Sequence, residues 1–380
     1  MSSKRRPGEV RDAILEVLMA HRGRATVREI QAGVADRIGR VPPSSIRSYL
    51  QLNTPGIFAR SDRAQYELDE SFLRPPEAVK PAVRAARAPF RHGSSLLVQD
   101  DCINWLRQRT PNSVHAVVTD PPYGLQEYTE EQQAKLRTGR GGVWRIPPSF
   151  DGAKRSPLPR FTVLTQAELK ELQDFFYVWA RVLSPALVPG ANVVVASNPL
   201  LSHIVSGALA RAGLERRGEL IRLVMTMRGG DRPKAAHAEF SEVSVMPRSM
   251  WEPWLLFRKP VEGRIQDNLR KWMTGGFRRP SAERPFGDVL ASAPTRASER
   301  ALAPHPSLKP QAFLRKLVRG VLPLAKGVVL DPFAGAGSTL AAAEAVGYES
   351  VGVEKDPHYF DIASIAIPKL AKLEMKGNGD

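Results

Sequence analysis

The chain has 380 residues, a formal net charge of +16 and a pI of about 10.2. This length allows more than one domain, each with a sizeable core. The excess of Lys and Arg favours an acidic partner such as a nucleic acid, although a generally basic protein would show the same charge.

The single cysteine excludes a disulfide within the chain and a cysteine-rich zinc site. The 7 histidines show no metal-ligand spacing, so we expect no metal. No apolar run approaches the roughly 20 residues of a membrane span, and no signal-peptide core follows the first residues. We therefore expect a cytoplasmic, nucleoid-associated protein without membrane contact.

Residues 1–75 predict a small domain of three helices followed by a β-hairpin. Apolar residues recur at helical spacing from Val10 to Leu18, and Thr26-Val-Arg-Glu29 is a capping box that opens a second helix. A third helix begins near Pro43, and residues 58–68 alternate around a short polar turn. The order is typical of a winged helix-turn-helix.

In such a domain the third helix would enter a major groove of DNA and the hairpin would touch the backbone. The candidate DNA contacts are Arg47 on the third helix, with Arg60 and Arg63 in the hairpin. The same fold also serves to bind protein or to pack on another domain, and that alternative stays open.

Residues 76–93 are rich in Pro, Ala and Arg and predict a basic, semi-extended linker. Residues 94–378 alternate between apolar strands and helices, with strands expected at 193–196, 222–227 and 254–257. This alternation predicts a second, α/β domain with a mostly parallel sheet covered by helices.

The motif Asp120-Pro121-Pro122-Tyr123 follows a buried apolar strand. Two prolines stiffen the turn, so the Asp120 carboxylate and the Pro121 carbonyl become fixed hydrogen-bond acceptors beside a ring that can stack. A planar base with an exocyclic amine would fit such a group. A simple strand-ending turn with a surface Tyr is the alternative when the motif stands alone.

A second motif, Asp331-Pro-Phe-Ala-Gly335-Ala-Gly337-Ser-Thr339, leads from an apolar strand into an Ala-rich helix. Glycines let the backbone approach a ligand at a helix N-terminus, and Glu354 ends the next strand, where an acid can bond ribose hydroxyls. The third glycine of the NAD fingerprint and a Walker lysine are both missing. These features favour a nucleoside ligand without a pyrophosphate.

With these motifs the chain resembles the β class of amino DNA methyltransferases, in which the catalytic tetrad precedes the cofactor loop. Residues 97–106, with Asp101 and Cys102, and the segment His305-Pro-Ser-Leu-Lys309-Pro also match family motifs. The resemblance spans about residues 94–370. It implies a Rossmann-like, doubly wound, mostly parallel methyltransferase sheet and S-adenosyl-L-methionine as cofactor.

The resemblance also assigns roles to individual residues. Asp120, Pro121, Pro122 and Tyr123 become the catalytic tetrad. Asp101 and Cys102 would lie at the cofactor's adenine, Glu354 would hold its ribose, and Lys309 would lie near its carboxylate or the closing loop. The full set of expected cofactor contacts is Asp101, Cys102, His305, Lys309, Asp331, Phe333, Gly335, Gly337, Ser338, Thr339, Glu354 and Lys355.

The implied reaction is methylation of a base flipped out of double-stranded DNA. Asp at the first tetrad position favours N6 of adenine, and N4 of cytosine is the alternative. The motif order disfavours an RNA or protein-glutamine methyltransferase, and the intact motifs disfavour a non-catalytic DNA-binding regulator. A homodimer and a cognate restriction endonuclease are further expectations from the family.

Two basic insertions interrupt the α/β pattern, at residues 125–164 and 259–304. We expect the first to close over the flipped base and the second to recognise the target, whereas surface insertions without either role are the alternative. The expected DNA contacts in these segments are Arg137, Arg140, Arg145, Lys271, Arg278 and Arg279.

Overall fold

The structure is a computed structural model that describes residues 9–52, 54, 58–62, 64–68, 87–122, 166–224, 232–233, 236–247, 249–305 and 308–375. The chain forms two compact units, residues 1–85 and 86–380. Within the described residues, no helix is both long and apolar enough to cross a membrane.

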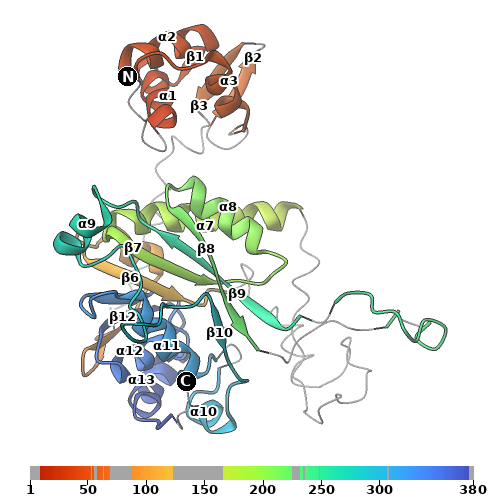
Figure 1. Ribbon diagram of the computed structural model, residues 1–380, viewed down its shortest axis with the longest axis vertical. Coiled ribbons are helices and arrows are strands. Elements are labelled where there is room, and N and C mark those ends of the chain that lie inside the picture. Colours follow the sequence, from red (N-terminus) through yellow and green to blue (C-terminus); the bar gives the residue numbers. More distant parts are fainter. Residues whose placement is uncertain are drawn as a thin grey trace. The chain divides into compact units, whose positions relative to one another are not determined.

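Among its described residues, the first unit has three helices and a three-stranded antiparallel sheet of order β1-β3-β2 (Figure 1). The Thr26 side chain accepts from the Glu29 backbone N–H, and the Glu29 carboxylate accepts from the Thr26 backbone N–H, so the predicted capping box is confirmed. The elements are α1 (Glu9–Ala20), β1 (Arg24–Thr26), α2 (Val27–Ile38), α3 (Pro43–Leu52), β2 (Phe58–Asp62) and β3 (Gln65–Leu68).

The second unit is built on a nine-stranded sheet of order β10-β8-β9-β7-β6-β11-β12-β5-β4. The five strands from β7 to β5 are parallel, whereas β9 and β4 run antiparallel to their neighbours. The strands are β4 (Phe90–His92), β5 (Ser95–Gln99), β6 (Val114–Thr119), β7 (Leu187–Ala196), β8 (Glu215–Leu223), β9 (Trp251–Arg258), β10 (Val289–Ala291), β11 (Val328–Asp331) and β12 (Glu349–Glu354).

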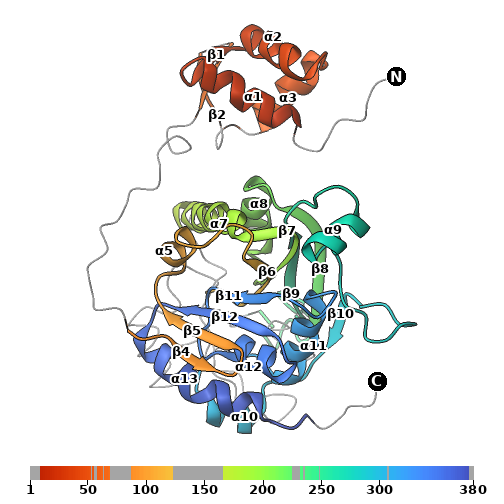
Figure 2. The same cartoon turned by 90° about the vertical axis from the view of Figure 1, so that its left-hand side faces the viewer.

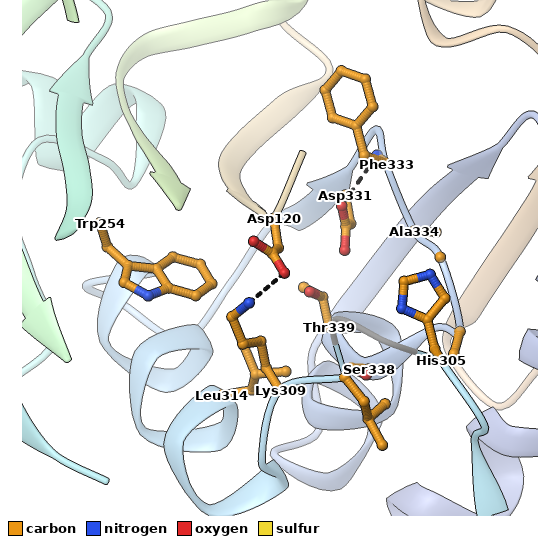
Figure 3. A pocket seen from close by; sticks show the side chains of 13 residues that line it. Asp120, Trp254, His305, Lys309, Leu314, Asp331, Phe333, Ala334, Ser338 and Thr339 are labelled. Atoms are coloured by element: carbon orange, nitrogen blue, oxygen red, sulfur yellow. Dashed lines mark hydrogen bonds and ion pairs between the residues drawn. The ribbon is translucent and has the colours of Figure 1, made fainter. Parts of the chain in front are cut away.

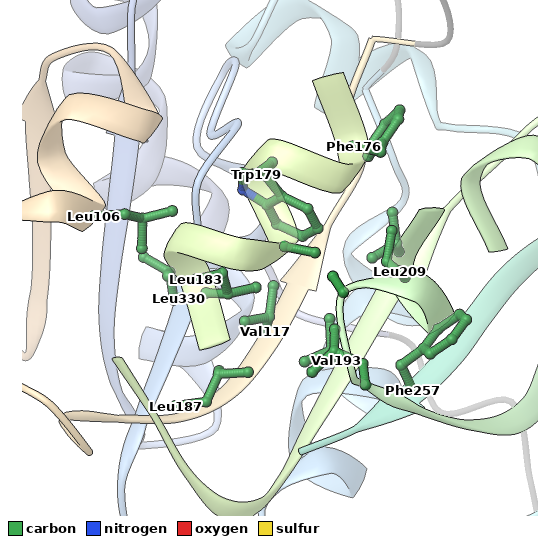
Figure 4. Packing of buried hydrophobic residues seen from close by; sticks show 14 of the residues in the cluster. Leu106, Val117, Phe176, Trp179, Leu183, Leu187, Val193, Leu209, Phe257 and Leu330 are labelled. Atoms are coloured by element: carbon green, nitrogen blue, oxygen red, sulfur yellow. The ribbon is translucent and has the colours of Figure 1, made fainter. Parts of the chain in front are cut away.

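Helices cover both faces of this sheet (Figure 2). Phe176, Trp179 and Leu183 repeat at helical spacing and pack with α5 and α8 on one face (Figure 4). Neighbouring residues of β6 point to opposite faces, so Val117 joins this cluster and Val118 joins a second cluster with α11 and α12. The helices are α5 (Cys102–Arg107), α7 (Gln166–Ala186), α8 (Ser202–Arg211), α9 (Ile265–Trp272), α10 (Ala297–Leu302), α11 (Gln311–Val321), α12 (Ser338–Ala345) and α13 (Pro357–Ala371).

The prediction of an α/β fold with a mostly parallel sheet is therefore confirmed. The strand expected at 222–227 instead spans Glu215–Leu223, and residues 225–227 lie outside the described part. Late strands complete the centre of the sheet, because β11 pairs with β6 and β12 pairs with β5. This order brings the carboxyl ends of β6 and β11 together, where ligands of such sheets bind.

Candidate active site

A pocket lies at the carboxyl ends of β6 and β11 and joins the two main sequence motifs (Figure 3). Asp120 follows β6 directly, and the glycine-containing turn follows β11. The two motifs therefore share one pocket. Its lining consists of Asp120, Trp254, His305, Leu308, Lys309, Leu314, Asp331, Phe333, Ala334, Gly335, Ala336, Ser338 and Thr339.

The turn between β11 and α12 requires glycine at two positions. Gly335 and Gly337 have φ values of +50° and +77°, which L side chains rarely adopt. A Cβ on Gly337 would also lie 2.5 Å from Ile367 Cγ1 on α13. The turn is therefore held tightly against α13 and presents its backbone at the N-terminus of α12, where a ligand can approach.

Asp331 ties the two motif-bearing strands together beneath the pocket. Its Oδ1 accepts from Thr119 Oγ1 at 2.7 Å and from the Phe333 backbone N–H at 3.2 Å. Burial raises the pKa of the Asp331 carboxyl to about 6, although these hydrogen bonds oppose the shift. A buried carboxylate of this kind is best stabilised by a nearby positive charge.

Glu354 ends β12 beside the same turn. Its Oε2 accepts from the Gly335 backbone N–H at 2.7 Å, and its Oε1 accepts from the Asp356 backbone N–H at 2.8 Å. Burial raises the pKa of Glu354 to about 7 despite these two hydrogen bonds. The carboxyl group therefore titrates near neutral pH while it holds the glycine turn in place.

The segment that contains Asp101 and Cys102 lies next to Glu354, because β5 pairs with β12. Asp101 caps α5 by accepting from two backbone N–H groups, and its Oδ2 is 3.1 Å from Lys355 Nζ. Cys102 is buried, and burial raises the pKa of its thiol to about 12. The thiol therefore stays protonated, which fits a packing role rather than a nucleophile.

His305 packs on the glycine turn from the segment that precedes α11. Its ring lies edge-on to Tyr359 with ring centroids 4.5 Å apart. Burial, assisted by the nearby Lys309 ammonium, lowers the pKa of His305 to about 4. The imidazole is therefore neutral at physiological pH and can act as a hydrogen-bonding wall of the pocket.

Lys309 makes a contact that the sequence did not predict. Its Nζ donates to Asp120 Oδ2 at 2.5 Å and lies 3.3 Å from Glu252 Oε1 on β9. Burial opposes the charge of Lys309, but Asp120 and Glu252 raise its pKa above the usual value. The charged ammonium therefore links the first residue of the tetrad to a second carboxylate.

A family model described as DNA methylase, of the N6 and N4 type, matches residues 114–364, which is more than half of the chain. The chain belongs to this family. The match includes both the Asp120 motif and the glycine turn.

Curated methyltransferases resemble this DNA methylase over most of their own lengths. Type II methyltransferase M.HindIII of Haemophilus influenzae is 24% identical over 294 residues, covering 70% of this chain and 93% of the relative. Type II methyltransferase M2.DpnII of Streptococcus pneumoniae is 22% identical over 279 residues, covering 72% and 90%.

Two solved structures are also similar to it. The M1.HpyAVI–SAM complex has a TM-score of 0.45 and 16% identity, covering 73% of this chain and 100% of the other. PvuII DNA methyltransferase, which is cytosine-N4-specific, has a TM-score of 0.47 and 14% identity, covering 75% and 88%.

The DNA methylase does not bring every predicted DNA contact to the pocket. Lys271 pairs with Glu262 at 2.7 Å, on a helix that Asn268 fastens to the start of β7. Arg278 donates to Tyr348 Oη, just before β12 begins. Lys271 and Arg278 thus lie at the amino ends of the strands, opposite Asp120, and Arg279 follows in the same segment. Their binding to DNA stays a prediction.

Other predicted residues fall in different places. Arg47 on α3 and Arg60 on β2 are exposed in the first unit. Pro121 is buried and Pro122 is half-buried, just beyond the carboxyl end of β6. The predicted residues outside the described part of the chain are Arg63, Tyr123, Arg137, Arg140 and Arg145, together with the insertion 125–164.

Sequence reasoning missed Glu252 and Arg222, which extend the charges around Lys309. Arg222 Nη1 donates to Glu252 Oε2 at 2.9 Å. Glu252 lies on β9, which is otherwise mostly apolar and buried, and Arg222 lies among apolar residues at the end of β8. This was the available signal, because a charge in such a strand is costly unless a partner accompanies it.

Proposed function

We propose that this DNA methylase transfers a methyl group from S-adenosyl-L-methionine to N6 of an adenine that is flipped out of duplex DNA. The observation that carries the proposal is the shared pocket. In it, Asp120 lies beside a glycine turn with positive φ values at a helix N-terminus.

The residues of the pocket fit the proposed cofactor. When bound, S-adenosyl-L-methionine supplies an electrophilic methyl group on a positively charged sulfur. Asp331 and Glu354 are carboxyls whose pKa values burial has raised, so a cationic ligand would stabilise their charged forms. Gly335 has no side chain, so a ligand can approach its backbone closely, and a Cβ there would lie 3.2 Å from His305 Nε2 in the same pocket.

Asp120 and Pro121 would recognise the target amine. The Asp120 carboxylate and the Pro121 carbonyl accept one N–H each, which turns the nitrogen lone pair towards the methyl group. Transfer would break the bond between the methyl carbon and sulfur and leave a neutral thioether. The Asp120 carboxylate would stabilise the positive charge that the nitrogen gains until the nitrogen loses a proton. Alignment of the two reactants accounts for much of the rate. We further propose that the Tyr123 ring stacks on the flipped base.

The choice of adenine rests on aspartate as the first residue of the tetrad. The test is methylation-sensitive sequencing of DNA from a host that expresses the protein. We expect N6-methyladenine in one short sequence context. N4-methylcytosine would instead select the alternative substrate, and unmodified DNA would contradict the proposal.

Asp120→Asn tests the site itself. The amide keeps the shape but removes the charge, so single-turnover methyl transfer should fall by about 10²–10³-fold, the usual loss for one charge-stabilising group. Calorimetric affinity for the cofactor should stay within a few-fold. Near-normal transfer by this variant would place the chemistry elsewhere.

The first unit has the element order of a winged helix, and we propose that it binds DNA. Support comes from the exposed Arg47 on α3 and Arg60 on the β2–β3 hairpin. The type II names of the curated relatives also favour a partner restriction endonuclease for this methylase.

A further inference from the structure

A network of four charged side chains of alternating sign includes the proposed catalytic aspartate. Its members are Asp120, Lys309, Glu252 and Arg222. Lys309 Nζ is 2.5 Å from Asp120 Oδ2 and 3.3 Å from Glu252 Oε1. Glu252 Oε2 in turn lies 2.9 Å from Arg222 Nη1. Figure 3 shows the Lys309–Asp120 end of this network within the pocket. One end of the network is therefore the carboxylate that is proposed to bind the target amine.

The side chains of this network are largely shielded from water. Only 10% of the Lys309 side chain and 17% of the Asp120 side chain are exposed. Weak screening makes the charges act on one another more strongly than at a surface. A buried ammonium needs a carboxylate partner, and Glu252 is a second carboxylate within salt-bridge distance of Lys309 Nζ.

Glu252 is itself fixed by its other neighbours. Arg222 holds it from β8, while the Arg222 guanidinium also donates to Ser292 Oγ at 3.0 Å and to the Ala293 carbonyl at 3.2 Å. Trp254 Nε1 donates to Glu252 Oε2 at 3.4 Å. The acceptor of Lys309 is thus anchored by the sheet and by the strand segment before α10.

We propose that Lys309 and Glu252 are positioning residues for Asp120. Lys309 fixes one oxygen of the Asp120 carboxylate and keeps the group ionised. Glu252 is a second carboxylate partner of the lysine and weakens the lysine's electrostatic effect on Asp120. The pair thereby sets how strongly the carboxylate attracts the amine of the target base. This inference rests on the proposed methyl transfer and deepens it.

The two residues should act on Asp120 in opposite directions. Lys309→Met removes the cation that favours the ionised carboxylate, so the acid limb of the pH profile of single-turnover transfer should move up by about one to three pH units. Glu252→Gln leaves the lysine charge on Asp120 alone, so the acid limb should move down. Lys309→Arg keeps the charge and should leave the limb in place.

The other titratable or charged groups near Asp120, Lys309 and Glu252 are the same in these single variants. They are Arg222 on β8, His305 in the segment before α11 and Asp331 on β11. Glu219→Gln is the matched control, because Glu219 lies on β8 and pairs with Arg216 at the surface at 2.9 Å. It should move neither limb nor rate.

The experiment uses the full chain with three readouts: single-turnover transfer to DNA against pH, calorimetric cofactor affinity without DNA, and melting temperature. Cofactor affinity should stay within about threefold in every variant. If Glu252→Gln does not fold, Arg222→Met/Glu252→Gln removes both members of the neighbouring pair. Its acid limb should also move down.

The inference would be overturned if the acid limbs of Lys309→Met and Glu252→Gln did not move, or moved in the same direction, even if the melting temperature fell. A large loss of cofactor affinity in Lys309→Met with an unmoved limb would assign the lysine to the cofactor and overturn it too. Failure of the wild-type chain to methylate any DNA would instead overturn the proposed function, so the two failures are distinguishable.

Discussion

At the scale of a single residue, the predicted contact of Glu354 with the cofactor's ribose would link cofactor binding to pH. Burial raises its pKa to about 7, and the ionised carboxylate is the form that accepts best from ribose hydroxyls. Cofactor affinity should therefore rise by about tenfold between pH 6 and pH 8 as the carboxyl ionises. Calorimetric titrations across this range would measure the change.

Glu354→Gln is the test of that assignment, because the amide cannot ionise. Its affinity should be lower and nearly independent of pH over the same range. Asp331 also titrates with a pKa of about 6, so Asp331→Asn is the control that should retain most of the slope above pH 7. A Glu354→Gln profile that still rises tenfold would place the titrating group elsewhere.

The same residue affects stability with a definite sign. Because the folded-state pKa of Glu354 is raised from 4.5 to about 7, the folded protein binds more protons than the unfolded chain within this window. The free energy of unfolding should therefore decrease as pH rises from about 4.5 to 7. Denaturant titrations should show a smaller decrease in Glu354→Gln.

The positions of some site residues in the fold could be predicted from the sequence, and those of others could not. Asp120, Gly335 and Glu354 each end a strand or begin a turn within a local motif, and the structure places them at one sheet edge. The Lys309–Asp120 pair joins positions 189 residues apart, so only the strand order could reveal it.

At the scale of elements, the turn before α12 is the part most sensitive to substitution. Gly337→Ala would force a side chain into a left-handed conformation and against Ile367, and should destabilise the protein by about 2–4 kcal/mol. Cofactor binding should be lost with it, because the turn is the proposed binding backbone. Denaturant titration and calorimetry measure the two effects.

Gly347→Ala, at the other end of α12, is the matched control. Gly347 has nearly the same φ, +78°, but a Cβ there would meet no atom within 4 Å. It should cost only about 1–2 kcal/mol for the backbone conformation and should leave cofactor affinity unchanged. Equal losses in both variants would show that close packing on α13 does not shape the turn.

Elements with strong local signals were predictable, whereas those decided by the sheet were not. Thr26 and Glu29 define the start of α2 within four residues. By contrast, β8 begins at Glu215, in a polar stretch that alternates poorly, because pairing with β9 along its whole length stabilises it. Tertiary pairing here overrides local propensity.

For the whole molecule, the first unit should set the salt dependence of DNA binding. Each lost phosphate contact reduces the slope of log affinity against log salt by about 0.9. Arg47→Ala/Arg60→Ala should therefore reduce the slope by up to about 1.8, while cofactor affinity stays unchanged. Fluorescence anisotropy at several salt concentrations measures this.

Arg24→Ala is the control for that experiment, since Arg24 already pairs with Glu67 at 2.6 Å in the same unit. Its slope should remain close to that of the wild type. If all variants keep the same slope, the first unit does not touch DNA, and a role in binding protein becomes the better explanation.

The strand order also has a consequence for synthesis on the ribosome. β5 and β6 are made early, yet each must wait for β12 or β11 as its neighbour, more than 200 residues later in the chain. Until then the growing chain exposes two unpaired strand edges, which are templates for aggregation. A chain that ends before β12 also lacks Glu354, which holds the glycine turn, so we expect methylation to begin only after synthesis has passed β12.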